Sequence, residues 1–260
     1  MNKYFRYLIS GYVFKRKSMI QRLHEPNHFS TTDKEFTLPR VAIYTVSTGK
    51  YDSLREPAYV DKNFDYYAFS SIEISKKSLW KQIEIGINGE DMSSLEQARY
   101  VKTHPHLYFK DYDISIFIDG NIQILCDIRP LIFTMIDQKK IIAIHRHTHW
   151  DCLYDEGKIV WAQGRAKWSD IYKQLRTYKK EGFPKHYGLF ETNVIIRFHN
   201  EKKCKDIMET WWSQIDKYTK RDQLSFTYSL WKNGVDSNFV LSLGNCSRNS
   251  NYFSVVNHNK

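Results

Sequence analysis

The sequence is poor in cysteine and has no long apolar run. It holds four cysteines in 260 residues, and none of them forms a CxxC pair. A zinc module or a dense disulfide framework is therefore not indicated, and the scattered cysteines fit a reducing compartment. No stretch approaches the ~20 apolar residues of a membrane-spanning helix. The N-terminus lacks an apolar core followed by a small-residue cleavage site, so we expect no secretory signal.

Acidic residues are also scarce relative to basic ones, with 29 Asp and Glu against 39 Lys and Arg and a net charge of +10. Such a balance favours anionic partners: phosphates, nucleotides, nucleic acid or an anionic membrane surface. The chain contains no recognised nucleic-acid-binding motif, so a basic nucleic-acid-binding protein is a rival interpretation rather than the first one. A hydrophobic fraction of 42% suffices for a packed core.

The two ends of the chain differ from the middle. Residues 1–38 are read as a basic N-terminal segment and linker, in which Tyr4, Leu8 and Tyr12 share one face of a possible helix. That helix would lie on an anionic membrane or pack on the domain. We expect a cytoplasmic protein with peripheral contact at the inner face of the cytoplasmic membrane. Residues 39–246 form the expected domain, and the Asn- and Ser-rich residues 247–260 are expected to be a loose polar tail.

Strand-like and helix-like segments alternate along the expected domain. We predict strands at 41–46, 65–70, 114–118, 122–125, from 141, and at 193–198, and helices at 91–103, 203–218 and 221–231, with 154–178 helical in its second half. Ser93 and Glu96 form a capping box for the first helix. Arg99 and Lys102 lie three residues apart and so share a helix face. This alternation predicts an α/β fold with a mixed, mostly parallel sheet flanked by helices.

The stretch 114–124 organises the prediction. Ile114 to Ile118 form an apolar run typical of a strand buried on both faces, and Asp119, Gly120 and Asn121 interrupt it. Gly120 allows a tight turn and the close approach of a ligand. Asp119 and Asn121 would then be two oxygen donors at the carboxyl edge of the sheet, suited to Mg²⁺ or Mn²⁺ carrying a diphosphate. The alternative is a β-hairpin, for which Asp-Gly is a strong signal.

Six ordered motifs resemble one known family: IYTVSTGKYD (43–52), ARYVKTHPH (98–106), ISIFIDGNI (114–122), HRHTHWDCLYDEG (145–157), ETNVIIRFHN (191–200) and RDQLSF (221–226). The order resembles a GT-A-type nucleotide-sugar glycosyltransferase, more narrowly the glycosyltransferase-like family of bacterial surface-polysaccharide loci and plant mucilage proteins. It implies transfer of a sugar from a nucleoside diphosphate donor, such as a UDP-sugar, to a glycan or lipid-linked acceptor, for example in capsule or lipopolysaccharide synthesis. One departure is Asn121, where GT-A enzymes usually carry a second Asp.

The resemblance also implies site residues. Arg99 and Lys102 would face the diphosphate, unless they form an ordinary solvated helix face. The metal would be held by Asp119 and Asn121, with a third ligand from among His145, His147 and His199. The alternative for each histidine is an ordinary hydrogen-bonded or exposed side chain. The residues expected to bind the donor are Thr45, Ser47, Tyr51, Ser70, Arg99, Lys102, Asp119, Gly120 and Asn121.

Acid–base chemistry is assigned to Asp222 and Glu191. Asp222 opens a predicted helix, where a carboxylate also serves as a cap. Glu191 precedes a predicted strand and is otherwise a surface carboxylate. A metal-dependent hydrolase that uses Asp119 and the cluster from His145 to His149 is the remaining rival.

Overall fold

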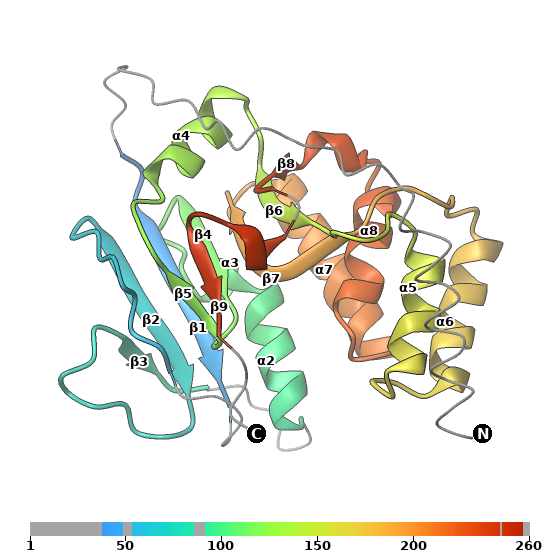
Figure 1. Ribbon diagram of the computed structural model, residues 1–260, viewed down its shortest axis with the longest axis horizontal. Coiled ribbons are helices and arrows are strands. Elements are labelled where there is room, and N and C mark those ends of the chain that lie inside the picture. Colours follow the sequence, from blue (N-terminus) through green and yellow to red (C-terminus); the bar gives the residue numbers. More distant parts are fainter. Residues whose placement is uncertain (1–37, 49–53, 86–91, 245, 257–260) are drawn as a thin grey trace.

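The predicted α/β fold is observed as a seven-stranded sheet with the order β3-β2-β1-β4-β7-β6-β8 (Figure 1). The computed structural model describes residues 38–48, 54–85, 92–244 and 246–256. Four of the pairings are parallel, and only β7 runs against its neighbours β4 and β6. The strands are β1 (Val41–Ser47), β2 (Phe64–Ser70), β3 (Lys81–Ile83), β4 (Ile114–Ile118), β6 (Ile142–Arg146), β7 (Phe190–Arg197) and β8 (Leu241–Ser242).

Strand β4 lies at the centre of this sheet, as predicted. All five of its residues are buried, because the isoleucines face one core and Phe117 the other. After β4 the chain makes a tight turn in which the Ile122 N–H donates to the Asp119 carbonyl at 2.9 Å. The next strand, β5 (Ile122–Ile124), pairs with β9 (Phe253–Val255) in a separate two-stranded ribbon. The hairpin alternative is therefore wrong, since β4 and β5 belong to different sheets.

Helices cover both faces of the sheet and one end (Figure 1). The helices α2 (Ser94–Thr103), α7 (Lys202–Lys217) and α8 (Gln223–Lys232) pack on one face, whereas α4 (Arg129–Asp137) and the β5–β9 ribbon pack on the other. A third core joins α8 to α5 (Leu153–Ala162) and α6 (Trp168–Lys180). The predicted capping box of α2 is confirmed, and the short helix α3 (Pro105–Tyr108) follows it.

Three segments differ from the expectation. Strand β7 begins at Phe190, so Glu191 lies inside the strand instead of before it. The segment 154–178 is helical in both halves, as α5 and α6. The tail expected to be loose from residue 247 instead forms a 3₁₀ turn, η2 (Ser247–Asn249), and β9, whose Phe253 is buried in the core. Phe253 anchors this segment together with Tyr252 and Val255, which pack against the same core, and with the pairing of β9 to β5. The N-terminal segment 1–37 lies outside the described residues, and within the described part no helix is long and apolar enough to cross a membrane.

Candidate active site

The carboxyl ends of β1, β2 and β4 meet at one edge of the sheet. Tyr44 is in register with Phe117, and Ser47 with Ser70, so the predicted residues Thr45, Ser47 and Ser70 lie at the same edge as Asp119. Within the described ranges, the buried Thr45 hydroxyl has no hydrogen-bond partner. The Ser70 hydroxyl donates a hydrogen bond to the Ile72 carbonyl and accepts one from the Ile72 N–H. Tyr51 falls outside the described residues.

Strand β7 brings further residues to this edge because it runs in the opposite direction. Ile144 faces Ile195, but the next residue of β6, His145, faces Glu191, so β7 bulges outward between these two pairs. A bulge redirects the side chains of the strand that carries it. The Thr192 hydroxyl donates a hydrogen bond to Asp222 Oδ2 at 3.0 Å, whereas Glu191 contacts Ser247.

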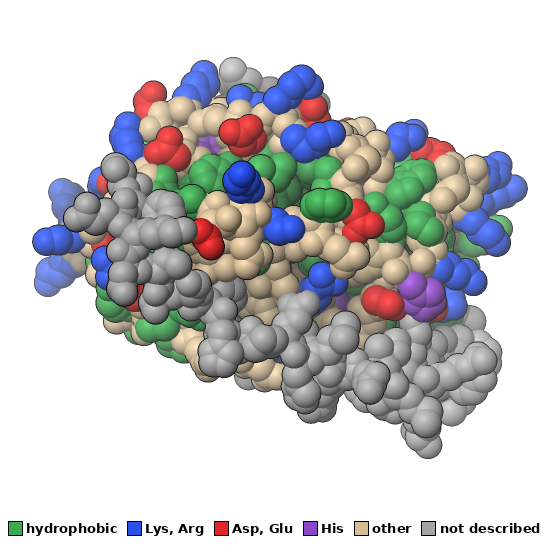
Figure 2. All heavy atoms as spheres, turned by 90° about the horizontal axis from the view of Figure 1, so that it is seen from above, with side chains coloured by type: hydrophobic (Ala, Val, Ile, Leu, Met, Phe, Trp, Pro, Cys, Tyr) green, Lys and Arg blue, Asp and Glu red, His purple; other side chains and the backbone are tan. Residues whose placement is uncertain are grey.

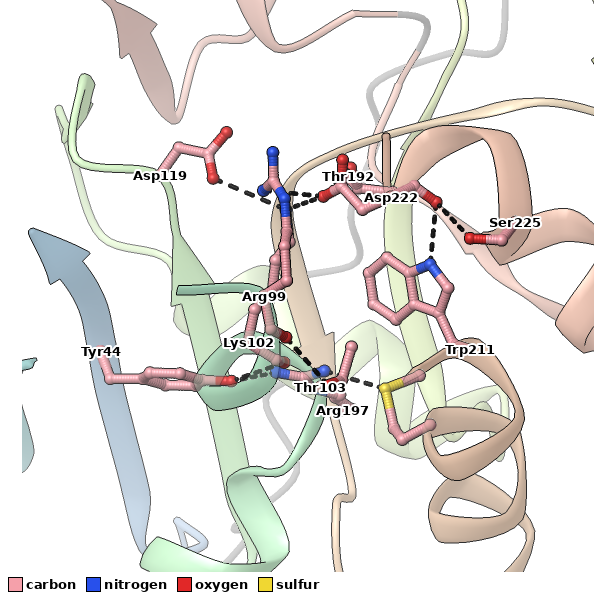
Figure 3. A network of polar contacts seen from close by, with 11 residues as sticks. Tyr44, Arg99, Lys102, Thr103, Asp119, Thr192, Arg197, Trp211, Asp222 and Ser225 are labelled. Atoms are coloured by element: carbon pink, nitrogen blue, oxygen red, sulfur yellow. Dashed lines mark hydrogen bonds and ion pairs between the residues drawn. The ribbon is translucent and has the colours of Figure 1, made fainter. Parts of the chain in front are cut away.

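A buried ion cluster forms below the edge (Figure 3). The Asp222 Oδ2 atom lies 2.6 Å from Lys102 Nζ and 3.0 Å from Arg99 Nη1. Lys102 Nζ is also 3.6 Å from Asp119 Oδ1, so one lysine joins two carboxylates. The Lys102 side chain is only 1% exposed, against 37% for Asp119. Lys102 is therefore not part of a solvated helix face, and Asp119 is the member that a ligand can reach.

The cluster fixes the charge of Asp222. Burial by itself raises the pKa of this carboxyl, but Arg99 and Lys102 outweigh burial and hold the pKa well below its usual range. The side chain does not cap α8, although Asp222 is the residue before that helix. Its backbone carbonyl accepts a hydrogen bond from Trp211 Nε1 at 2.8 Å. Asp222 is thus a permanently ionised anchor for two cations rather than a helix cap.

Glu191 lies in a second polar group, between β7 and η2. Its Oε2 atom accepts hydrogen bonds from the Ser247 N–H at 3.1 Å and the Ser247 hydroxyl at 2.9 Å. Asn193 Nδ2 donates to the same hydroxyl at 2.6 Å. Thr192 and Asn193 lie within the motif at 191–200, but nothing in the sequence singled out these two residues or Ser247, because their convergence depends on the reversed strand and on the folded tail.

Glu156 is a further acid that sequence reasoning missed. It is 4% exposed, accepts a hydrogen bond from Trp150 Nε1 at 2.5 Å and lies 4.0 Å from His147 Nε2. Burial raises its pKa to about 7, against the opposing effects of the Trp150 hydrogen bond and the positive charges of Arg221 and Arg165. In the sequence Glu156 resembles an ordinary acid in the first turn of a helix. The fold, by burying this carboxyl group, is what raises its pKa.

The histidines do not gather around Asp119. His199 follows β7 at the opposite edge, where Arg197 faces Ser115, and its Nε2 donates to the Phe109 carbonyl at 2.8 Å. It is therefore not placed to share a metal ion with Asp119, because β7 is antiparallel. The His145 ring is buried against Phe253, and burial lowers its pKa to about 4.

The other two histidines of the predicted cluster follow the end of β6 at Arg146, so they do not alternate along a strand. His147 Nδ1 accepts from the backbone N–H groups of His149 and Trp150, at 3.3 and 3.4 Å. Across the described ranges, no group of three or more His, Cys, Asp or Glu side chains is arranged to hold a metal ion. The hydrolase interpretation therefore has no metal centre among these residues.

The turn after β4 offers one accessible carboxylate for a metal. Asn121 Nδ2 donates to the Val256 carbonyl at 3.1 Å, which ties the turn to the end of β9. Mg²⁺ is usually bound through one or two carboxylates, with phosphate oxygens and water as the remaining ligands. Asp119 fits such an ion, carried in with a diphosphate.

An edge of this kind on a mixed α/β sheet is the usual ligand site of open α/β folds. Residues 76–258 match the family model "TOD1/MUCI70, glycosyltransferase-like domain", and the chain belongs to this family. The resemblance predicted from the motifs is confirmed. A relative, "Probable hexosyltransferase MUCI70" of Arabidopsis thaliana, is 23% identical in an alignment of 225 residues, and the match covers 74% of this chain and 37% of the plant protein. The chain thus spans just over a third of the length of that relative.

Several solved glycosyltransferase structures resemble this chain at low sequence identity. The bifunctional glycosyltransferase WbbM gives a TM-score of 0.47 at 12% identity, covering 81% of this chain and 40% of that one. The galactosyltransferase LgtC gives a TM-score of 0.43 at 12% sequence identity, and the match covers 77% of this chain and 72% of LgtC. The mannosyltransferase Ktr4p of S. cerevisiae, in complex with GDP, gives a TM-score of 0.46 at 11% sequence identity, and the match covers 92% of this chain and 78% of Ktr4p. The GT-A-like fold expected from the motifs is seen in the sheet itself, and the family match is consistent with it.

Proposed function

We propose that this protein transfers a hexose from a nucleoside diphosphate sugar, UDP-linked in the first instance, to a hydroxyl of a glycan or lipid-linked acceptor. The observation that carries the proposal is the buried Lys102, which joins Asp119 and Asp222 at the carboxyl edge of β4 with Arg99 beside it. Family membership supports the reaction class. The motif resemblance supports a role in surface-polysaccharide synthesis at the inner face of the cytoplasmic membrane.

The leaving diphosphate develops negative charge as the sugar departs, and preorganised cations stabilise it. Arg99 contacts Asp222 through Nη1, and its side chain is 16% exposed. The exposed part of the guanidinium is the part that could donate to a phosphate oxygen. Asp222 holds Arg99 and Lys102 in place, and Lys102 in turn orients Asp119. A Mn²⁺ or Mg²⁺ ion bound by Asp119 would supply Lewis-acid neutralisation of the same diphosphate.

Glu191 is the better candidate for accepting the proton of the acceptor hydroxyl in an inverting reaction. A general base works best when its pKa lies near the operating pH, and the pKa of Asp222 is held far below that range. Glu191 is aligned by two hydrogen bonds from Ser247 and lies one residue from Thr192, which contacts Asp222. A retaining reaction needs no strong base. In either an inverting or a retaining reaction, the cluster of Arg99, Lys102 and Asp222 would stabilise the leaving diphosphate.

The test is a panel of nucleoside diphosphates and nucleotide sugars, scored by thermal shift and by calorimetry with and without Mn²⁺. A ligand that binds only the native state raises the melting temperature. We expect a UDP-type ligand to do so, and more strongly with metal. Absence of nucleotide binding under every metal condition would refute the proposal. Donor turnover without acceptor would indicate a hydrolase, and salt-dependent oligonucleotide binding would indicate the nucleic-acid interpretation.

A further inference from the structure

The outward face of α6 carries aromatic side chains that a folded core would normally cover. Trp168 and Tyr172 are 41% and 51% exposed and lie one helical turn apart. The opposite side of the helix is packed in the third core through Ile171, Leu175 and Tyr178. The Trp168 ring also stands 5.3 Å from that of Trp161, at the end of α5. Exposed aromatic residues in such a row mark an interaction surface.

The same face is strongly basic. Lys173, Arg176, Lys179 and Lys180 are exposed on α6, and Asp170 is the only acidic residue of the helix. None of the four cations forms an ion pair with another described residue. Helical geometry places Arg176 two turns beyond Trp168 and one beyond Tyr172, so charge continues the aromatic row. Lys and Arg side chains gather with hydrophobic ones at this end, on the right in Figure 2, where α5 and α6 lie in Figure 1.

We propose that this α6 outer face, from Trp168 to Lys180, docks the protein on the anionic lipid headgroups of a membrane surface. Trp and Tyr rings settle at the headgroup level, and Lys and Arg extend their charges to lipid phosphates. Each Lys or Arg near such a surface strengthens binding about fivefold. The four unpaired cations supply the charge that complements the lipid phosphates.

A soluble acidic glycan is the other polyanion that could meet these cations. Sugar hydroxyls need hydrogen-bond acceptors as well as donors from the protein, and Asp170 is the only carboxylate of the helix. The face therefore fits headgroup phosphates better than sugar rings. Docking through α6 goes beyond the proposed transfer reaction and does not depend on it, because its readout is lipid binding rather than turnover.

The experiment is co-sedimentation of the full chain with phosphatidylcholine vesicles, with and without phosphatidylserine. The double variant Lys173→Gln/Arg176→Gln removes two charges in the middle of α6, and glutamine keeps the helix propensity high. We expect its affinity for the anionic vesicles to fall about 25-fold. The matched control is Lys76→Gln/Lys77→Gln, two exposed lysines between β2 and β3 at the other end of the sheet. The control should bind nearly as tightly as the wild type.

Direct contact is read from the quenching of tryptophan fluorescence by brominated lipids. Quenching should be clear in the wild type and should drop in Trp168→Phe, whose fold is verified by circular dichroism. Equal binding by the α6 double variant and the wild type would overturn the proposal, since binding would then come from another segment. Failure of the wild type to bind anionic vesicles would also overturn it. So would binding to a soluble acidic polysaccharide that depends on Lys173 and Arg176 in the absence of lipid binding.

Discussion

Replacing Glu156 by glutamine should stabilise the protein at pH 8 much more than at pH 5. The pKa of Glu156 is raised from 4.5 to about 7, so the folded state binds this proton more tightly than the unfolded chain does. The stability that the proton provides is complete below the unfolded pKa and is lost as pH rises through the folded one. The shift corresponds to roughly 3 kcal/mol, of which about 2–3 kcal/mol falls between pH 5 and pH 8. Glutamine keeps the shape and can still accept the Trp150 hydrogen bond.

The assay is urea unfolding of both proteins at several pH values from 5 to 8. The pKa values of His145, His147 and His199 are each lowered to about 4 by burial, so these residues reduce stability as pH falls. For His145 and His199 this effect is shared by wild type and variant and cancels in the difference, whereas His147, whose Nε2 lies 4.0 Å from Glu156, contributes to it. Glu73→Gln, at an exposed position, is the control for charge removal alone. A wild-type-to-variant difference that stays constant across this pH range would contradict the burial argument.

Three further substitutions test the site and its surroundings. Asp119→Asn should lower donor turnover at saturating Mn²⁺ sharply while leaving the melting temperature of the metal-free protein unchanged or higher; unchanged turnover would remove Asp119 from the metal site. Lys102→Met should cost about 3–5 kcal/mol in urea unfolding because Asp222 loses its 2.6 Å partner, and adding Asp222→Asn should restore part of that loss. Gly157→Ala should destabilise by about 1–3 kcal/mol, because the new Cβ would lie 2.6 Å from Leu175 Cδ1; a gain in stability from the better helix former would show that α5 and α6 have room to separate.

The central sheet could be predicted because local pattern and tertiary environment agree there. The run from Ile114 to Ile118 is apolar at every position, apart from a small serine, and β4 is buried at every position. The Ser93–Glu96 capping box depends on neighbours in the chain alone, and α7 has a wide apolar stripe, so both were predicted. Strand β9 was missed because its short apolar stretch, residues 252–256, follows an Asn- and Ser-rich segment, and its partner strand β5 lies far away in the sequence.

The site was only partly predictable for a different reason. Asp119 follows a strand directly, so its place at the sheet edge is a local property. Glu156 is an acid in the first turn of a helix, and its burial depends on Trp150 and on the packing of α5. His199 was placed wrongly because the direction of β7 cannot be read from its composition. The same reversal brought Thr192 to Asp222 without any signal in the sequence.

The β5–β9 ribbon links the Asp119 turn to the order in which the chain is synthesised. Ile122 pairs with Val255, half a chain length later, and the Asn121 side chain is held by Val256. Domains fold as units during translation, starting from the N-terminal side. Most strands of the large sheet therefore exist before the segment that secures this turn has been made. A nascent or truncated chain that lacks residues 253–256 should collapse around the large sheet and yet bind donor poorly, so the Asp119 turn becomes competent to bind donor only after these residues have been made.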